Sequence, residues 1–253
     1  MGKAVQGKTK EQFVHSVFES IAPKYDKMNS ILSFRRHKAW RKFTMAKMNV
    51  KPGSTAIDIC CGTCDWTISM AKASGTGEMV GLDFSQNMLD YGAGKIREEG
   101  LDNQIRLVHG NAMSLPFDDN TFDYATIGFA LRNVPDVEQV LREMQRVVKP
   151  GGLVVSLELS KPTWRPFKAL YYFYFQKVLP LLGKLIAKSY EQYRWLPESL
   201  ISFPDYKELA EIFRRTGLQK VEAYPLTFGI AALHIGVKGN SSQESKTDAT
   251  THS

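Results

Sequence analysis

Long apolar runs are missing from this sequence of 253 residues, of which 43% are hydrophobic and 23% charged. No stretch reaches the roughly 18 uncharged apolar residues that a transmembrane helix needs, and the first residues lack the apolar core of a secretory signal. We therefore expect a cytoplasmic globular protein made of one domain, or of one domain with an insertion.

Cysteine is also scarce, because the three thiols Cys60, Cys61 and Cys64 lie in one short stretch. Thiols this close make a poor disulfide framework, which argues against an oxidising compartment. The C-x-x-C spacing of Cys61 and Cys64 suits a redox pair or half of a zinc site, but a second Cys pair is missing and the five His are scattered. We expect no metal and interpret the thiols as small residues of a tight strand-to-helix turn.

Acidic residues are few near the N-terminus, where residues 1–50 hold eleven Lys and Arg against three Asp and Glu. Such a basic segment attracts an anionic membrane surface or a nucleic acid, or it is a plain solvated face. The aromatic residues of the segment are spaced as core residues rather than as a platform for stacking bases. We therefore expect no nucleic acid partner.

Helical spacing dominates residues 1–50, which we expect to form an N-terminal helical cap. After Pro52-Gly53, short β-rich runs alternate with helical patterns. The expected strands are 55–60, 79–82, 105–109, 122–129, 153–159, 221–226 and 231–237, and the expected helices are 65–73, 85–99, 136–148 and 205–215. This order predicts an α/β fold with a mostly parallel sheet and helices on both faces.

Two local details belong to the predicted organisation. Ser85 is the expected N-cap of its helix, and Pro150-Gly151-Gly152 is the expected turn before the fifth strand.

Within the main domain, 51–238, residues from about 161 to 200 interrupt the alternation. Their segment Pro166–Lys188 is rich in aromatic residues and Lys, and it predicts amphipathic helices that form a lid, a membrane-facing surface or ordinary helix packing. Residues 239–253 are polar and predicted to be a disordered tail.

Candidate ligand-binding residues fall where predicted parallel strands end. Asp58 and the loop 60–65 follow the first strand, Asp83 ends the second, and Asn111-Ala112 follows the third. Ligands of open α/β sheets bind at these carboxyl ends. A carboxylate there can accept both ribose hydroxyl protons, and an amide can bind an adenine edge. The turn offers a single glycine, Gly62, instead of a phosphate-binding G-x-G-x-x-G, so an adenosyl ligand without phosphates, such as S-adenosylmethionine, fits best.

Two longer stretches resemble signatures of the UbiE/MenG family, the C-methyltransferases of menaquinone and ubiquinone synthesis. The first, residues 25–40, contains Tyr25-Asp26-Lys27-Met28-Asn29, Leu32-Ser33, His37 and Trp40, and is similar to Y-D-x-M-N-x-x-[LIVM]-S-x-x-x-H-x-x-W at every fixed position. The second runs from Arg146-Val147-Val148-Lys149-Pro150-Gly151-Gly152 to Leu157-Glu158-Leu159-Ser160 and resembles R-V-[LIVM]-K-P-G-G…[LIVM]-E-x-S. The resemblance covers residues 10–238.

The resemblance implies a class I S-adenosylmethionine-dependent methyltransferase fold, Rossmann-like with a seven-stranded mostly parallel sheet, N-terminal helices and a helical insertion. Its cofactor motif, D-[VI]-x-x-G-T-[GA]-D, maps onto Asp58, Gly62, Thr63 and Asp65. Cys64 departs from the motif, since it stands where Gly or Ala is usual. Asp83 would then hold the ribose, and Asn111 and Ala112 would lie beside adenine.

The implied reaction is C-methylation of a prenylated demethylnaphthoquinol, the last step of menaquinone synthesis. The resemblance gives roles in the acceptor site to Arg132 and Asn133, and places the N-terminal residues over that site as a cap: Tyr25, Asp26, Met28, Asn29 and His37. Arg132 is a poor base because guanidinium stays protonated, but it could stabilise a phenolate or orient a water. His37 or Asp26 could accept the proton, and Glu158 is either structural or acceptor-facing.

The sequence is also compatible with other functions. The same fold could methylate a ubiquinone precursor or an O- or N-acceptor, and a weaker alternative is a non-catalytic nucleic-acid-binding protein. Because a prenylated quinol lives in a bilayer, we expect a cytoplasmic enzyme that associates peripherally with an anionic membrane surface. A homodimer is one compatible assembly.

Overall fold

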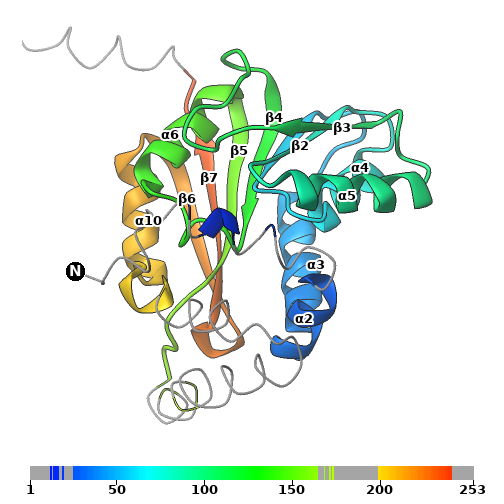
Figure 1. Ribbon diagram of the computed structural model, residues 1–253. Helices are drawn as coiled ribbons and strands as arrows, with labels where there is room; N and C mark the ends of the chain where they lie inside the picture. Colours follow the sequence, from blue (N-terminus) through cyan, green and yellow to red (C-terminus); the bar gives the residue numbers. More distant parts are fainter. Residues whose placement is uncertain are drawn as a thin grey trace, which may run out of the picture.

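A single sheet of seven strands in the order β3-β2-β1-β4-β5-β7-β6 forms the centre of the computed structural model (Figure 1). The structure describes residues 25–164 and 199–240 and the single positions Gln12, 14–16, Glu19, Lys168, Tyr171 and Phe173. Strand β7 alone runs antiparallel to its neighbours β5 and β6. The predicted α/β fold with a mostly parallel sheet is confirmed. The strands are β1 (Ala56–Ile59), β2 (Met79–Asp83), β3 (Ile105–His109), β4 (Phe122–Gly128), β5 (Val148–Leu159), β6 (Leu218–Leu226) and β7 (Ala231–Lys238).

Helices cover both faces of the sheet, as the strand pattern requires. They are α2 (Tyr25–Leu32), α3 (Arg36–Met48), α4 (Asp65–Ser74), α5 (Gln86–Glu98), α6 (Val137–Val147), α10 (Tyr206–Arg215) and the short η4 (Thr227–Gly229). Buried side chains of α6 and α10, among them Leu141 and Phe213, pack on one face. Those of α3 and α4, among them Trp40 and Trp66, pack on the other. All four residues of β1 are buried, so both faces of this strand are covered, and Asp58 is its one polar residue.

Helix starts follow local capping chemistry. Ser85 caps α5 by accepting a hydrogen bond from the Met88 amide at 3.3 Å, which confirms the expected N-cap. Asp136 caps α6 in the same way, and Asp205 and Glu208 form a reciprocal capping box at the start of α10. These side chains satisfy amide donors that have no partner within the helix.

One predicted turn is wrong. Pro150-Gly151-Gly152 was expected to precede the fifth strand, but β5 begins earlier, with Val148 paired to Phe122. The ladder resumes with Leu153 opposite Tyr124, so the intervening residues form an irregularity inside one strand. Gly151 has φ of +80°, a backbone conformation that a bulge accommodates without ending the strand.

The expected lid and tail fall mostly outside the described residues. Only 161–164, 199–200 and three single positions of the 161–200 region are described, and the tail is described only to residue 240. Much of the expected helix before residue 25 also lies outside. Within the described part of the chain, no helix is long and apolar enough to cross a membrane.

Close packing between α5 and the loop after β1 depends on Gly92. A Cβ at this position would collide with the Sγ of Cys64, which is fully buried. Cys64 itself has φ of +64° and precedes the first turn of α4. The side chain that departs from the family motif therefore fills a space that Gly92 leaves open in the neighbouring helix.

Gly92→Ala should lower the free energy of unfolding by about 1–3 kcal/mol, because the added methyl group overpacks the contact with Cys64. Gly94 lies in the same helix with open space around its Cα, so Gly94→Ala should instead stabilise by up to about 1 kcal/mol. Urea unfolding of both variants tests this. The double variant Cys64→Gly, Gly92→Ala should recover most of the loss, and failure to recover it would show that Cys64 is not the constraint.

Candidate active site

A pocket opens at the carboxyl ends of the central strands. It lies where the strand order reverses between β1 and β4, the usual ligand position in an open α/β sheet. The space between its walls is about 720 Å³, part of it continuous with solvent. The walls come from Cys60 and Gly62 after β1, Asp83 and Phe84 at the end of β2, 110–113 after β3, 128–130 and 133–135 after β4, Met88 on α5, and Val14 and Tyr25.

Asp83 is the central polar group of this pocket. Its carboxylate is buried and accepts backbone hydrogen bonds from Gly62 at 2.8 Å and from Ser85 at 2.9 Å. Burial raises the pKa of Asp83, while these amides act in the opposite direction. Each carboxylate oxygen keeps acceptor capacity after binding one amide, so the group can also accept from a diol.

The loop after β1 is built from left-handed backbone. Cys60, Gly62 and Cys64 have φ of 54°, 53° and 64°. Such values are unusual for cysteine and cost free energy that the surrounding packing must offset. The tight winding brings the Gly62 amide to Asp83. The Tyr25 ring lies next to Gly62, since a Cβ on Gly62 would be 3.8 Å from Tyr25 Cε1.

Asn111 and Ala112 line the pocket on the side of β3. The carboxamide oxygen of Asn111 accepts from the Met113 amide at 2.9 Å, which fixes the side chain in the wall. The pocket thus brings together four residues that were predicted from their positions at strand ends: Asp83, Gly62, Asn111 and Ala112.

Asp58 is placed differently from the expectation. It lies inside β1 rather than after it, is buried, and is absent from the pocket walls. Its two oxygens accept from the hydroxyls of Thr67 at 2.7 Å and Thr126 at 2.8 Å. Burial raises its pKa to about 6. The contacts of Asp58 therefore join β1 to α4 and β4, behind the pocket.

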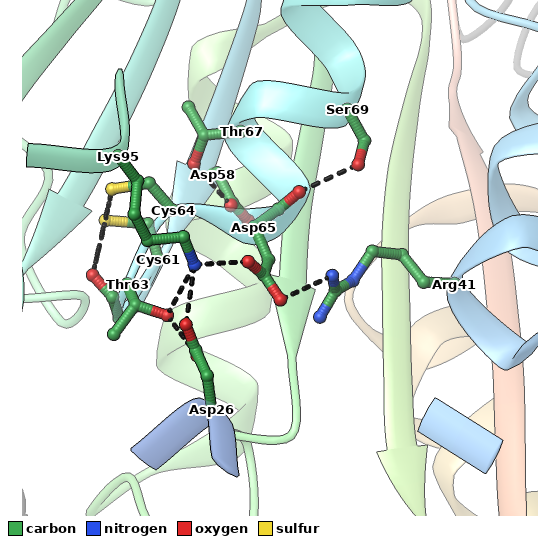
Figure 2. A network of polar contacts seen from close by, with 11 residues as sticks. Asp26, Arg41, Asp58, Cys61, Thr63, Cys64, Asp65, Thr67, Ser69 and Lys95 are labelled. Atoms are coloured by element: carbon green, nitrogen blue, oxygen red, sulfur yellow. Dashed lines mark hydrogen bonds and ion pairs between the residues drawn. The ribbon is translucent and has the colours of Figure 1, made fainter. Parts of the chain in front are cut away.

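Thr63 and Asp65 also face away from the pocket walls, into a network of charges (Figure 2). Thr63 donates to Asp26 at 2.6 Å, and Lys95 on α5 binds Asp26 at 2.7 Å and also pairs with Asp65. Arg41 on α3 pairs with the other oxygen of Asp65 at 2.8 Å. Sequence reasoning missed Lys95, because nothing local marks a lysine whose partners lie 30 and 69 positions away.

Among the residues expected to bind the acceptor, Tyr25 and Asn133 line the pocket. Burial raises the pKa of the Tyr25 hydroxyl, which is hydrogen-bonded to Asn29. Met28 is buried, and neither Met28 nor Asn29 belongs to the walls. Of these three residues of α2, Tyr25 lines the pocket, whereas Met28 and Asn29 lie outside its described walls.

Arg132 lies just behind the wall formed by its neighbour Asn133. It is buried with Glu158, whose Oε1 accepts from Arg132 Nη1 at 2.6 Å. The same guanidinium nitrogen donates to the Phe129 carbonyl, and Glu158 also accepts from the backbone amides of Arg132 at 3.3 Å and Leu159 at 2.7 Å. This places Glu158 as a structural partner of the loop after β4, the alternative that the sequence left open.

His37 and Asp26, the expected proton acceptors, are not brought to the pocket walls. The Nδ1 of His37 shares a hydrogen bond of 2.6 Å with the Ser33 hydroxyl, and burial lowers the pKa of the ring. Asp26 is held by Thr63 and Lys95. Both residues support the cap and its neighbours.

The residues of the pocket walls indicate which kind of adenosyl ligand fits. Among the described lining residues, Asp83 is the sole charged side chain, and no Lys, Arg or His faces the pocket to meet a phosphate. Three glycines and two alanines let the backbone approach the ligand. An adenosyl compound that carries positive charge and no phosphate, which describes S-adenosylmethionine, matches these walls. No group of three or more potential metal ligands occurs among the described residues.

The strand order and this phosphate-free adenosyl pocket define a class I S-adenosylmethionine-dependent methyltransferase. An S-adenosylmethionine-dependent methyltransferase from Aquifex aeolicus shares the fold with a TM-score of 0.62, 16% identity and coverage of 87% of this chain and 98% of that one. The [4+2]-cyclase SpnF gives a TM-score of 0.68 at 17% identity, covering 94% and 99%.

Residues 6–238 match the ubiE/COQ5 methyltransferase family, and the chain belongs to that family. A relative from Bacillus cytotoxicus, named demethylmenaquinone methyltransferase, is 58% identical over 234 residues, which cover 92% of this chain and 98% of the relative. The resemblance found in the sequence is confirmed.

Asp83→Asn should weaken binding of S-adenosylmethionine by about 100-fold, because the amide can no longer accept from two backbone amides and a ribose diol together. Isothermal titration calorimetry measures this affinity. Asp123→Asn is the matched control, since Asp123 also accepts a backbone hydrogen bond, from Thr55, but lies at the opposite end of the sheet. Equal affinities for the two variants would remove Asp83 from the cofactor site.

Proposed function

We propose that this enzyme methylates a ring carbon of a prenylated demethylnaphthoquinol, converting demethylmenaquinol to menaquinol in the last step of menaquinone biosynthesis. The observation that carries this proposal is the near full-length similarity to relatives named demethylmenaquinone methyltransferase, 58% identical in Bacillus cytotoxicus and 59% in Bacillus cereus. The pocket supports it, because apolar walls next to the cofactor position suit an aromatic acceptor.

Bound S-adenosylmethionine supplies an electrophilic methyl group on a sulfonium. The protein has to align an acceptor carbon with it, and alignment of this kind is worth up to about 7–11 kcal/mol. We assign the contact with the acceptor ring to Tyr25 and Asn133, which line the pocket from the cap and from the loop after β4. Phe129, with φ of 56°, and Val134 supply apolar wall on the same side.

Arg132 acts electrostatically in this proposal. A ring carbon becomes nucleophilic when the neighbouring hydroxyl loses its proton, so a fixed positive charge near that oxygen favours the reactive form. Arg132 precedes Asn133, which lines the pocket, and its charge favours ionisation of the Tyr25 hydroxyl, although burial raises the pKa of that group overall. Glu158 keeps the guanidinium in place rather than contacting the acceptor. Asp26 and His37 hold the cap and are not assigned the proton.

A methyl-transfer assay with labelled S-adenosylmethionine and reduced demethylmenaquinone tests the proposal. We expect a ring-methylated product by mass spectrometry, and little product with a demethylated ubiquinone precursor. Arg132→Ala should lower kcat by at least tenfold while the cofactor affinity stays similar. Methylation of an oxygen, or of the benzoquinone in preference to the naphthoquinone, would overturn the proposed acceptor.

We also propose that the enzyme binds its acceptor at an anionic membrane surface. Phe34 is 74% exposed in the turn between α2 and α3, and it is followed by the exposed Arg35 and Arg36. Phe228 of η4 and Trp164 are 59% and 54% exposed, and their rings are in tilted contact with centroids 5.6 Å apart. A hydrogen bond of 2.8 Å between Trp40 and Thr227 fastens α3 to η4. Exposed aromatic rings beside Arg are typical of interfacial binding.

Vesicle sedimentation should recover more enzyme with acidic vesicles than with neutral ones, and high salt should reduce the difference. Phe34→Ser should weaken the binding several-fold, because about 25 cal/mol is lost per Å² of apolar surface that no longer enters the interface. Tyr91→Ser is the matched control, since Tyr91 is an exposed aromatic residue of α5. Identical sedimentation with both types of vesicle would contradict the membrane proposal.

A further inference from the structure

Four elements of the chain meet at the amino group of Lys95. Lys95 belongs to α5, Asp26 to the cap helix α2, Thr63 to the loop after β1, and Asp65 to the start of α4. Lys95 Nζ lies 2.7 Å from Asp26 and 3.3 Å from the Thr63 hydroxyl, and it pairs with Asp65 (Figure 2). These contacts tie α2 and α5 to the contiguous stretch 63–65, since Asp26 lies 37 positions before Thr63 and Lys95 lies 30 positions after Asp65.

The charges alternate along this cluster. Three successive ion pairs link negative and positive side chains in the order Asp26, Lys95, Asp65 and Arg41. The Lys95 side chain is 22% exposed, Asp65 and Arg41 are 30% and 19% exposed, and Asp26 is 37% exposed, so solvent screens the pair with Asp26 most. Burial opposes the charge of Lys95, but its two carboxylate partners outweigh burial and raise its pKa. Without Lys95, two carboxylates would face each other across the loop.

The cluster stands directly behind the cofactor pocket. Asp26 follows Tyr25 in the chain and Thr63 follows Gly62, and both Tyr25 and Gly62 line the pocket. The Tyr25 ring covers Gly62. Any movement of α2 away from the pocket must therefore break the bonds of Asp26 to Thr63 and Lys95.

We propose that the Asp26–Lys95–Thr63 contact is a latch, in which Lys95 is a positioning residue that holds α2 and Tyr25 closed over the cofactor loop. Opening the latch releases the cofactor product and admits the next cofactor. Lys95 touches neither cofactor nor acceptor and acts through Asp26 and Thr63. The proposal rests on the methyltransferase site and not on the identity of the acceptor.

Stopped-flow displacement of bound S-adenosylmethionine, with no acceptor present, measures the dissociation rate that the latch controls. Lys95→Met keeps the apolar stem and should raise this rate about tenfold, which corresponds to about 1.4 kcal/mol. High salt should speed dissociation from the wild type but not from Lys95→Met, because the attractive pair is absent there and salt screens only the remaining repulsion between Asp26 and Asp65. Lys95→Arg should restore most of the slow release.

Lys72→Met is the matched control. Lys72 lies on α4 and pairs at 2.6 Å with Glu99, the C-cap residue of α5, so its charge partner lies outside α2. Asp26→Asn tests the same latch while Lys95 keeps Asp65, so it covers the case in which Lys95→Met fails to fold. Both substitutions remove the Asp26–Lys95 pair, so the double variant should release the cofactor no faster than the faster single variant.

Dissociation rates that are equal for Lys95→Met and Lys72→Met would overturn the latch. Fully additive effects of Lys95→Met and Asp26→Asn would do the same, since they would show two independent contributions. Because the displacement is measured without acceptor, faster release from Lys95→Met than from Lys72→Met would support the latch whatever the outcome of the assay with demethylmenaquinone.

Discussion

The hydrogen bonds between the Asp83 carboxylate and the backbone amides of Gly62 and Ser85 hold the cofactor end of this protein together. They join the loop after β1 to the end of β2 and to the start of α5. A buried carboxylate is costly without such donors, and the left-handed loop has to wind tightly to supply one of them. Gly92 and Cys64 then let α5 approach that loop closely enough for Lys95 to reach across it.

Apart from Asp83, the paired charges next to the pocket lie behind its described walls. The Arg132–Glu158 pair lies under the loop after β4, and the Lys95 cluster lies under the loop after β1. Each pair fixes a wall residue next to it in the chain, Asn133 in one case and Gly62 in the other. The walls themselves stay small or apolar around a single carboxylate, which suits a cationic cofactor and an aromatic acceptor.

The fold alone does not specify the reaction, since a cyclase shares it with a TM-score of 0.68. What distinguishes members of such a fold is which side chains cover the cofactor. In this chain the helix next to the cofactor loop is α2, and the two residues that join them by a hydrogen bond, Asp26 and Thr63, belong to the stretches that resemble the family's motifs. Residues of a motif can therefore contact one another rather than line the pocket.

Apolar periodicity and turn residues are local signals, and they were enough to predict the alternation of strands and helices, the cap at Ser85, and the strand-end positions of Asp83, Gly62 and Asn111. The sequence misplaced the turn at Pro150, since a strand with a bulge and a turn share the same residues. It also could not separate the residues that line the pocket from those that support it. Asp58, Asp26, Thr63 and His37 lie behind the walls, and Lys95 has no local signature at all. Only the tertiary structure decided these roles, because they depend on partners that folding brings together from distant parts of the chain.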